Sequence, residues 1–111
     1  YVTWSAENRS QLIRIPAAVG EYRRAELRSA DPMTNPYIAY ALMIYAGLHG
    51  LAHDLQLCPA SDFNVYTAPA EVLEGLKKLP GSLAEAAALA EASAFIRKHL
   101  PEAVISAYCH Q

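Results

Sequence analysis

The sequence has few cysteines and no long apolar run. Its two cysteines, Cys58 and Cys109, lie far apart without a CxxC spacing, so a disulfide framework is not expected. We therefore expect a reducing, cytoplasmic environment. The longest apolar run covers 36–48, which is shorter than the about 20 residues that a helix needs to cross a bilayer. No membrane partner is expected.

The chain also has little net charge. Its formal charge is −2 and its pI is about 6.1, which argues against a nucleic-acid partner. The charge is unevenly spread, since residues 1–30 carry five arginines against three glutamates, a net +2 that leaves −4 for the rest. This distribution indicates a basic site on an acidic body.

Length and composition indicate part of a larger structure. With 111 residues, the chain is at most one domain with a modest core. Its hydrophobic content of 53% fits a piece that packs against other protein. Because the sequence begins at Tyr1 within a motif and without a methionine, we expect a fragment of a longer protein.

The residue pattern predicts an α+β fold, with short antiparallel β-strands followed by four helical segments. Strands are expected at 1–4, at 12–16 and, after a turn at Gly20, at 22–28. At this spacing they predict an antiparallel meander. The helical segments are predicted at 37–51, 69–79, 82–99 and 102–109.

Two helix starts carry clear local signals. Asn35 is a predicted N-cap, and Pro36 follows at the first helical position, where its missing N–H is harmless. Ser82 and Glu85 form a capping-box pattern. The helix at 37–51 is apolar on every side, which predicts that it is buried all round.

A row of charged residues within 22–28 is the strongest candidate for chemistry. Strand alternation places Arg24, Glu26 and Arg28 on one face. Guanidinium groups on either side should lower the pKa of Glu26. Such a row suits a site for phosphates, a divalent metal and a carboxylate substrate. Such a row also occurs as an exposed salt-bridge ladder in a structural domain, and it could belong to a phosphate- or nucleotide-binding module without catalysis.

Several motifs occur in a recognisable order: Asn8-Arg9-Ser10, Ile13-Arg14-Ile15-Pro16, Arg24-x-Glu26-x-Arg28, Asp31-Pro32, Asn35-Pro36-Tyr37 and Ala46-Gly47-Leu48-x-Gly50-Leu51. Together they resemble the C-terminal part of the glutamine synthetase catalytic domain, bacterial type. The resemblance implies that 1–111 is a C-terminal portion of that domain, with active-site strands in 1–30 and a helical part in 35–111.

The resemblance also implies an activity for the longer protein. Members of this family ligate ammonia to the γ-carboxylate of glutamate through a γ-glutamyl phosphate, with ATP as substrate and Mg²⁺ or Mn²⁺ as cofactor. They form ring-like homo-oligomers, so the expected partners are further copies and the remainder of the same catalytic domain. Related γ-glutamyl-amine ligases share much of the pattern, which leaves the nitrogen acceptor open between ammonia and another amine.

Individual roles follow from the same resemblance. Glu26 is implied as a metal ligand and Arg28 as the clamp on the glutamate carboxylate. The ATP phosphates and the transferred phosphoryl group are implied to meet Arg9, Arg14 and Arg24, with Arg9 as the catalytic candidate. Tyr66 is similar to the loop tyrosine that some bacterial members carry in adenylylated form, and is a candidate modification site.

The chain offers few other metal ligands. His49 and His53 are spaced i, i+4, but no third ligand stands at helical spacing, so a polar role at a helix end is expected rather than a metal site. With Glu26 as its one candidate ligand, the isolated chain is expected to be inactive.

Overall fold

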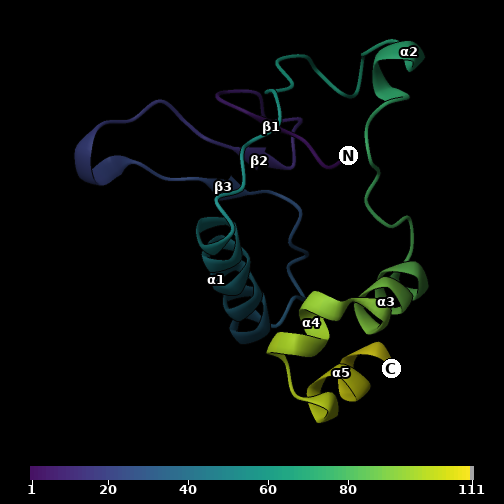
Figure 1. Ribbon diagram of the computed structural model, residues 1–111. Helices are drawn as coiled ribbons and strands as arrows, with labels where there is room; N and C mark the ends of the chain where they lie inside the picture. Colours follow the sequence, from purple (N-terminus) through teal and green to yellow (C-terminus); the bar gives the residue numbers. More distant parts are fainter. Residues whose placement is uncertain (111) are drawn as a thin grey trace. The chain divides into compact units, whose positions relative to one another are not determined.

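The computed structural model describes residues 1–110 and has an α+β fold, as predicted (Figure 1). It divides into two compact units. The first combines Tyr1–Met33 with Leu57–Leu79, and the second combines Thr34–Gln56 with the chain from Pro80 onward. All three strands lie within residues 1–30, and the longest helices belong to the second unit.

The first unit contains a sheet of three very short strands, β1 (Trp4–Ser5), β2 (Ile13–Arg14) and β3 (Glu26–Leu27), in the order β1-β2-β3. β2 and β3 pair antiparallel, as predicted. The prediction of a fully antiparallel meander is wrong, because β1 and β2 run parallel, with Trp4 opposite Ile13. The predicted strand at 22–28 is also too long, because a 3-10 turn, η1 (Gly20–Tyr22), precedes β3.

Side-chain hydrogen bonds explain how a parallel pair forms with so short a connection. Parallel strands usually need a crossover of a dozen or more residues. Here the buried Ser5 hydroxyl accepts hydrogen bonds from the backbone N–H groups of Glu7 at 3.4 Å and Asn8 at 3.2 Å. The Asn8 side chain then accepts from the Ser10 N–H at 2.9 Å. These two polar turns bring the chain back beside β1.

Gln11 connects the sheet to the loop before α2. Its side chain is buried, and its amide donates hydrogen bonds of 2.7 Å to the carbonyl oxygens of Ser61 and Phe63. Thr3 donates to the Gln11 carbonyl oxygen. The interior of this unit is therefore partly polar, with Val65 as its buried apolar side chain among the described residues.

The second unit begins with α1 (Pro36–Ala52), close to the predicted bounds (Figure 1). Its predicted cap is confirmed, because the Asn35 side chain accepts hydrogen bonds from the N–H groups of Tyr37 at 3.0 Å and Ile38 at 3.3 Å. The prediction that this helix is buried all round is wrong, since none of its residues is buried. Its aromatic contacts with α4 involve Tyr45 and His49, which leaves most of its circumference exposed.

The predicted helices at 69–79 and 82–99 differ from the structure, whereas the one at 102–109 is confirmed. α2 (Ala70–Leu73) ends early, because Gly75 disfavours a helix and the Lys77 carbonyl accepts a hydrogen bond of 2.7 Å from the Val2 N–H. The predicted helix at 82–99 is two helices, α3 (Leu83–Ala92) and α4 (Ala94–His99), because Ser93 is extended and caps α4 through the Ile96 N–H.

Helix α5 (Glu102–Cys109) follows Pro101 and contains the buried Ile105. It packs mainly against α3. Across the described residues, every helix is too short or too polar to traverse a lipid bilayer.

Candidate active site

Arg14 and Glu26 form a two-pronged ion pair in the sheet. They stand directly opposite each other in the antiparallel β2–β3 pairing. Arg14 Nε donates to Glu26 Oε2 and Arg14 Nη2 donates to Glu26 Oε1, both at 2.9 Å. Cross-strand neighbours lie close enough for such contact, and the planar guanidinium matches both carboxylate oxygens at once. Both oxygens of Glu26 are therefore engaged by one arginine.

A second arginine adds to this cluster. Arg24 Nε lies 3.4 Å from Glu26 Oε1. Glu26 is therefore flanked by two guanidinium groups, and this part of the prediction is confirmed. The identity of the pair differs from the prediction, because the partners are Arg14 and Arg24 rather than Arg24 and Arg28. The hydrogen bond from Arg14 lowers the pKa of Glu26, and the charge of Arg24 adds to this. The same hydrogen bond raises the pKa of Arg14.

Arg28 and Arg9 lie together in another place. Both line a hollow of about 250 Å³, which also includes Ser10, Gln11 and Tyr66. The Arg28 backbone N–H donates to the Leu12 carbonyl at 2.8 Å, which ties this segment to the start of β2. Arginine side chains at such a hollow can bind a carboxylate or phosphate through charge-assisted hydrogen bonds when their guanidinium groups face it. The predicted arginines thus form two groups, with Arg14 and Arg24 at Glu26 and Arg9 and Arg28 at the hollow.

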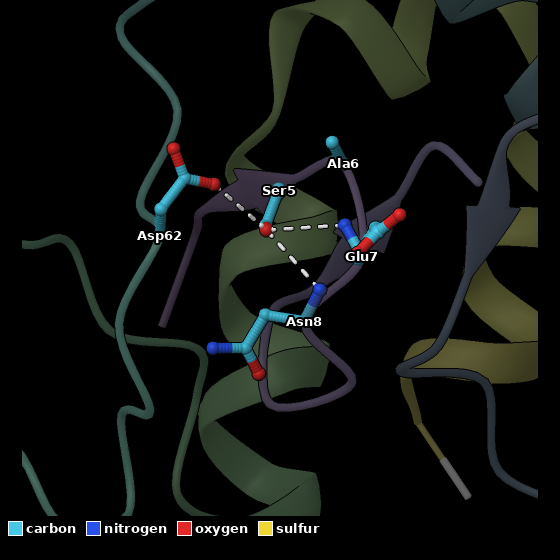
Figure 2. Close-up of a pocket in the computed structure, with 5 residues that line it drawn as sticks. All are labelled: Ser5, Ala6, Glu7, Asn8 and Asp62. Atoms are coloured by element: carbon cyan, nitrogen blue, oxygen red, sulfur yellow. Dashed lines mark hydrogen bonds between the residues drawn. The ribbon is translucent and has the colours of Figure 1, made fainter. Parts of the chain in front are cut away.

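A larger, shallow hollow of about 410 Å³ lies beside the β1 turn and has the opposite character (Figure 2). It is lined by Ser5, Ala6, Glu7, Asn8 and Asp62. The Ser5 hydroxyl donates to Asp62 Oδ1 at 3.1 Å and accepts from two backbone N–H groups (Figure 2). With two carboxylates and no cation in its lining, this hollow does not favour a phosphate.

Sequence reasoning assigned no role to Ser5 or Gln11, although both are almost fully buried and hydrogen-bonded. A buried glutamine or serine has no distinctive sequence spacing. Their partners, Asp62 and the carbonyls of Ser61 and Phe63, are fifty or more residues away. The nearest available signal was the cluster of polar turn residues before Arg9.

The described residues do not by themselves form a metal site. Among residues 1–110, no three His, Cys, Asp or Glu side chains are grouped so that they could hold an ion. Glu26 could provide one carboxylate, but Arg14 engages both of its oxygens. His49 and His53 stack with ring centroids 4.1 Å apart, and the His53 ring contacts the His49 carbonyl oxygen. A divalent cation at Glu26 would therefore need further ligands.

Tyr66 is strongly exposed, at 82% of its full accessibility. Its backbone N–H donates to the Asn64 side chain at 2.9 Å, which fixes the turn but leaves the ring free of that contact. An enzyme that modifies the phenol could reach it. Its modification stays a prediction.

Comparison with known proteins assigns the chain to a family. Residues 1–111 match the family described as "Glutamine synthetase, catalytic domain". The chain is 42% identical over 110 residues to glutamine synthetase of Methanosarcina mazei, covering 97% of this chain and 25% of that protein. It is 41% identical over 109 residues to the Pyrococcus abyssi glutamine synthetase, covering 93% of this chain and 24% of that protein.

A third relative, the Thermus thermophilus glutamine synthetase, is 42% identical over 105 residues, covering 93% of this chain and 24% of that protein. The chain is therefore an α+β segment of a catalytic domain with clustered arginines. The chain belongs to the glutamine synthetase family. It spans about a quarter of the length of the curated relatives that it matches.

Proposed function

We propose that this chain is the C-terminal portion of the catalytic domain of an enzyme that uses ATP to ligate ammonia to the γ-carboxylate of glutamate, through a γ-glutamyl phosphate. The observation that carries the proposal is the placement of four arginines in two groups within one sheet region of a glutamine synthetase family member. Phosphoryl transfer depends mainly on positioned cationic groups that stabilise developing negative charge.

We propose a different role for each of the two arginine groups. Arg14 and Arg24 lie around Glu26 and are proposed to meet the ATP phosphates. Arg9 and Arg28 share the second hollow, where Arg28 is proposed to bind the glutamate carboxylate and Arg9 the transferred phosphoryl group. A guanidinium suits both anions because its planar fork makes two parallel hydrogen bonds.

Glu26 is proposed to contribute one carboxylate to a site for Mg²⁺ or Mn²⁺, cations that favour oxygen ligands. The other ligands must come from the remainder of the catalytic domain, since the described residues hold no further group of ligands. The bound cation would offset charge on the phosphates. We further propose that the parent is a ring-like homo-oligomer in a cytoplasmic compartment, which is compatible with free Cys58 and Cys109.

The test is an assay of the full-length parent protein. Purified parent should form glutamine and ADP from glutamate, ATP and ammonia in the presence of Mg²⁺ or Mn²⁺. A panel of other amines in place of ammonia identifies the acceptor. ADP formation only with another amine would assign a γ-glutamyl-amine ligase, and nucleotide binding without ADP formation under any condition would contradict an enzymatic role.

A further inference from the structure

Arg9 is held in place by its two neighbours in the sequence. Among residues 1–110, its backbone makes no hydrogen bond to another backbone group, and its guanidinium makes no ion pair. The Asn8 side chain reaches past Arg9 and accepts hydrogen bonds from the Ser10 N–H at 2.9 Å and from the Ser10 hydroxyl at 2.8 Å. A turn of this kind restricts the backbone of the residue that it encloses. The placement of Arg9 therefore depends on the contacts of Asn8 and Ser10.

The Ser10 hydroxyl also ties this turn to the loop of residues 57–68. It accepts a hydrogen bond of 3.1 Å from the Val65 N–H. The Phe63 carbonyl oxygen lies 3.5 Å from the same hydroxyl. A serine hydroxyl has a single hydrogen to donate, and the contact of 2.8 Å with Asn8 has the better hydrogen-bond length. One hydroxyl thus joins Asn8 on one side to Val65 on the other.

This connection lies at the hollow that Arg9 lines. Ser10 and Val65 line the same hollow of about 250 Å³. Val65 is buried, Ser10 is half-buried and Arg9 is exposed. The hydrogen bond to the Val65 N–H therefore connects the turn that carries an exposed arginine to a residue in the interior of the same unit.

We propose that Ser10 is a positioning residue for Arg9, because its hydroxyl anchors the turn that carries Arg9 to the loop at Val65. This inference rests on the proposed contact of Arg9 with the transferred phosphoryl group. Catalysis depends steeply on placement, since an error of about 1 Å in a positioned group can cost about a hundredfold in rate. Loss of the anchor should therefore impair phosphoryl transfer more than the binding of ATP and glutamate.

The first experiment measures steady-state kinetics of the full-length parent. Ser10→Ala removes the acceptor of the Val65 N–H but keeps the backbone hydrogen bond to Asn8. Its kcat should fall by about tenfold to a hundredfold, with little change in the KM for ATP or glutamate. Ser10→Thr keeps a hydroxyl and should retain most of the activity. Thermal melts of the same preparations check that each variant is folded at the assay temperature.

The matched control is Ser61→Ala. Ser61 belongs to the loop of residues 57–68 and is half-buried, like Ser10. Its own hydrogen bonds in the structure use its backbone, with the N–H donating to the Trp4 carbonyl at 2.8 Å and the carbonyl accepting from Gln11 at 2.7 Å. Removing its hydroxyl leaves these connections in place. Its kcat should therefore stay close to that of the unmodified parent.

The second experiment is a double-mutant cycle between Ser10→Ala and Arg9→Ala. If Ser10 acts through Arg9, its substitution should cause little further loss once the Arg9 side chain is absent. A general stabilising role would lower the kcat by the same factor in both backgrounds. The cycle is repeated with equilibrium binding of inorganic phosphate, which needs no turnover and therefore also covers variants with very low activity.

The outcomes distinguish this inference from the proposed function. If Arg9→Ala leaves both the kcat and phosphate binding unchanged, the proposed role of Arg9 is wrong, and the inference is wrong with it. If Arg9→Ala impairs them while Ser10→Ala behaves like the unmodified parent, only the inference is overturned. Equal losses from Ser10→Ala with and without Arg9 would also overturn it, as would a loss in Ser10→Thr as large as that in Ser10→Ala.

Discussion

The buried amide of Gln11 donates a hydrogen bond of 2.7 Å to the carbonyl oxygen of Phe63, across 52 residues of sequence. A second bond of equal length reaches the Ser61 carbonyl. Gln11 is only 2% exposed, so water has little access to replace these hydrogen bonds. Gln11 thus holds the 57–68 loop against the sheet that carries the candidate site.

Replacing Gln11 should loosen this loop. Gln11→Leu leaves two carbonyl groups without their partner, and each buried unsatisfied group typically costs about 1–3 kcal/mol. Amide hydrogen exchange in peptides covering 57–68 of the parent should accelerate. Gln56→Leu, a change at an exposed glutamine, is the control. Unchanged exchange in Gln11→Leu would contradict the structural role.

Substitutions at Arg14 and Arg24 should impair the use of ATP. On the proposed roles, Arg14→Ala or Arg24→Ala in the parent would remove a charge-assisted contact to phosphate, and such a contact is worth roughly 1.5–3 kcal/mol, or about tenfold to a hundredfold in affinity or rate. The ATP requirement should rise and phosphoryl transfer should slow in steady-state kinetics. Arg23→Ala is the matched control. Ordinary ATP kinetics in both variants would favour a structural salt-bridge ladder.

Glu26 and Arg28 should show separate kinetic effects. Glu26→Gln keeps the shape of the side chain but removes the charge that a hard cation needs, so activity should require more Mg²⁺ or Mn²⁺. Arg28→Lys keeps a charge but loses the planar fork, so the requirement for glutamate should rise with little change in the requirement for metal.

Separate titrations of metal and glutamate against each variant test this division. The two residues lie in different surroundings, because Glu26 pairs with Arg14 and Arg24, whereas Arg28 lines the hollow with Arg9. If Glu26→Gln keeps its metal dependence and Arg28→Lys keeps its glutamate dependence, the roles assigned to both residues are wrong.

The Glu26 carboxylate should make stability depend on pH. Its pKa in the folded protein is lowered from the ordinary value of 4.5, chiefly by the Arg14 hydrogen bond. Because the pKa is lower in the folded protein, the ionised Glu26 contributes its full stabilisation above the ordinary pKa. This stabilisation is lost as the pH falls through the lowered pKa of the folded protein. The melting temperatures of the parent and of Glu26→Gln, measured over a pH series, should approach each other as the pH falls into the acid range. A gap that widens as the pH falls would contradict the pairing.

The isolated chain of 111 residues should form no glutamine. A phosphoryl-transfer site needs several metal ligands, and residues 1–110 group no three candidates. The assay combines purified chain with ATP, Mg²⁺, glutamate and ammonia, with full-length parent as the positive control. Turnover by the chain alone would show that the missing ligands are not required.

Much of the helical part could be predicted from local signals. Asn35 with Pro36, and Ser82 with Glu85, correctly placed two helix starts, because capping depends on residues within one turn. The break at Ser93 was missed because a serine is tolerated within an alanine-rich helix. In the structure, the Ser93 side chain caps α4 by accepting a hydrogen bond from the Ile96 N–H, which favours the break. The sequence alone does not show whether Ser93 continues the helix or caps a new one.

The site could be predicted only in part. The arginines and Glu26 were identified by their motifs, but alternation along 22–28 wrongly grouped Arg28 with Glu26. Alternation holds only over a regular strand, and β3 has two residues. The partnership of Arg14 with Glu26 depends on the register between strands, which is a long-range property that single-strand patterns do not contain.

The exposed apolar side of α1 has a consequence for handling the chain. Large side chains spaced by three or four residues share one side of the helix, and they are 55–85% exposed: Tyr37, Tyr40, Ile44, Leu48 and Leu51. An exposed hydrophobic stripe of this kind promotes self-association and binding by chaperones when no other protein surface covers it. Expression of these 111 residues alone should therefore give inclusion bodies or dye-binding aggregates, and polar substitutions along the stripe should improve solubility while disrupting assembly of the parent.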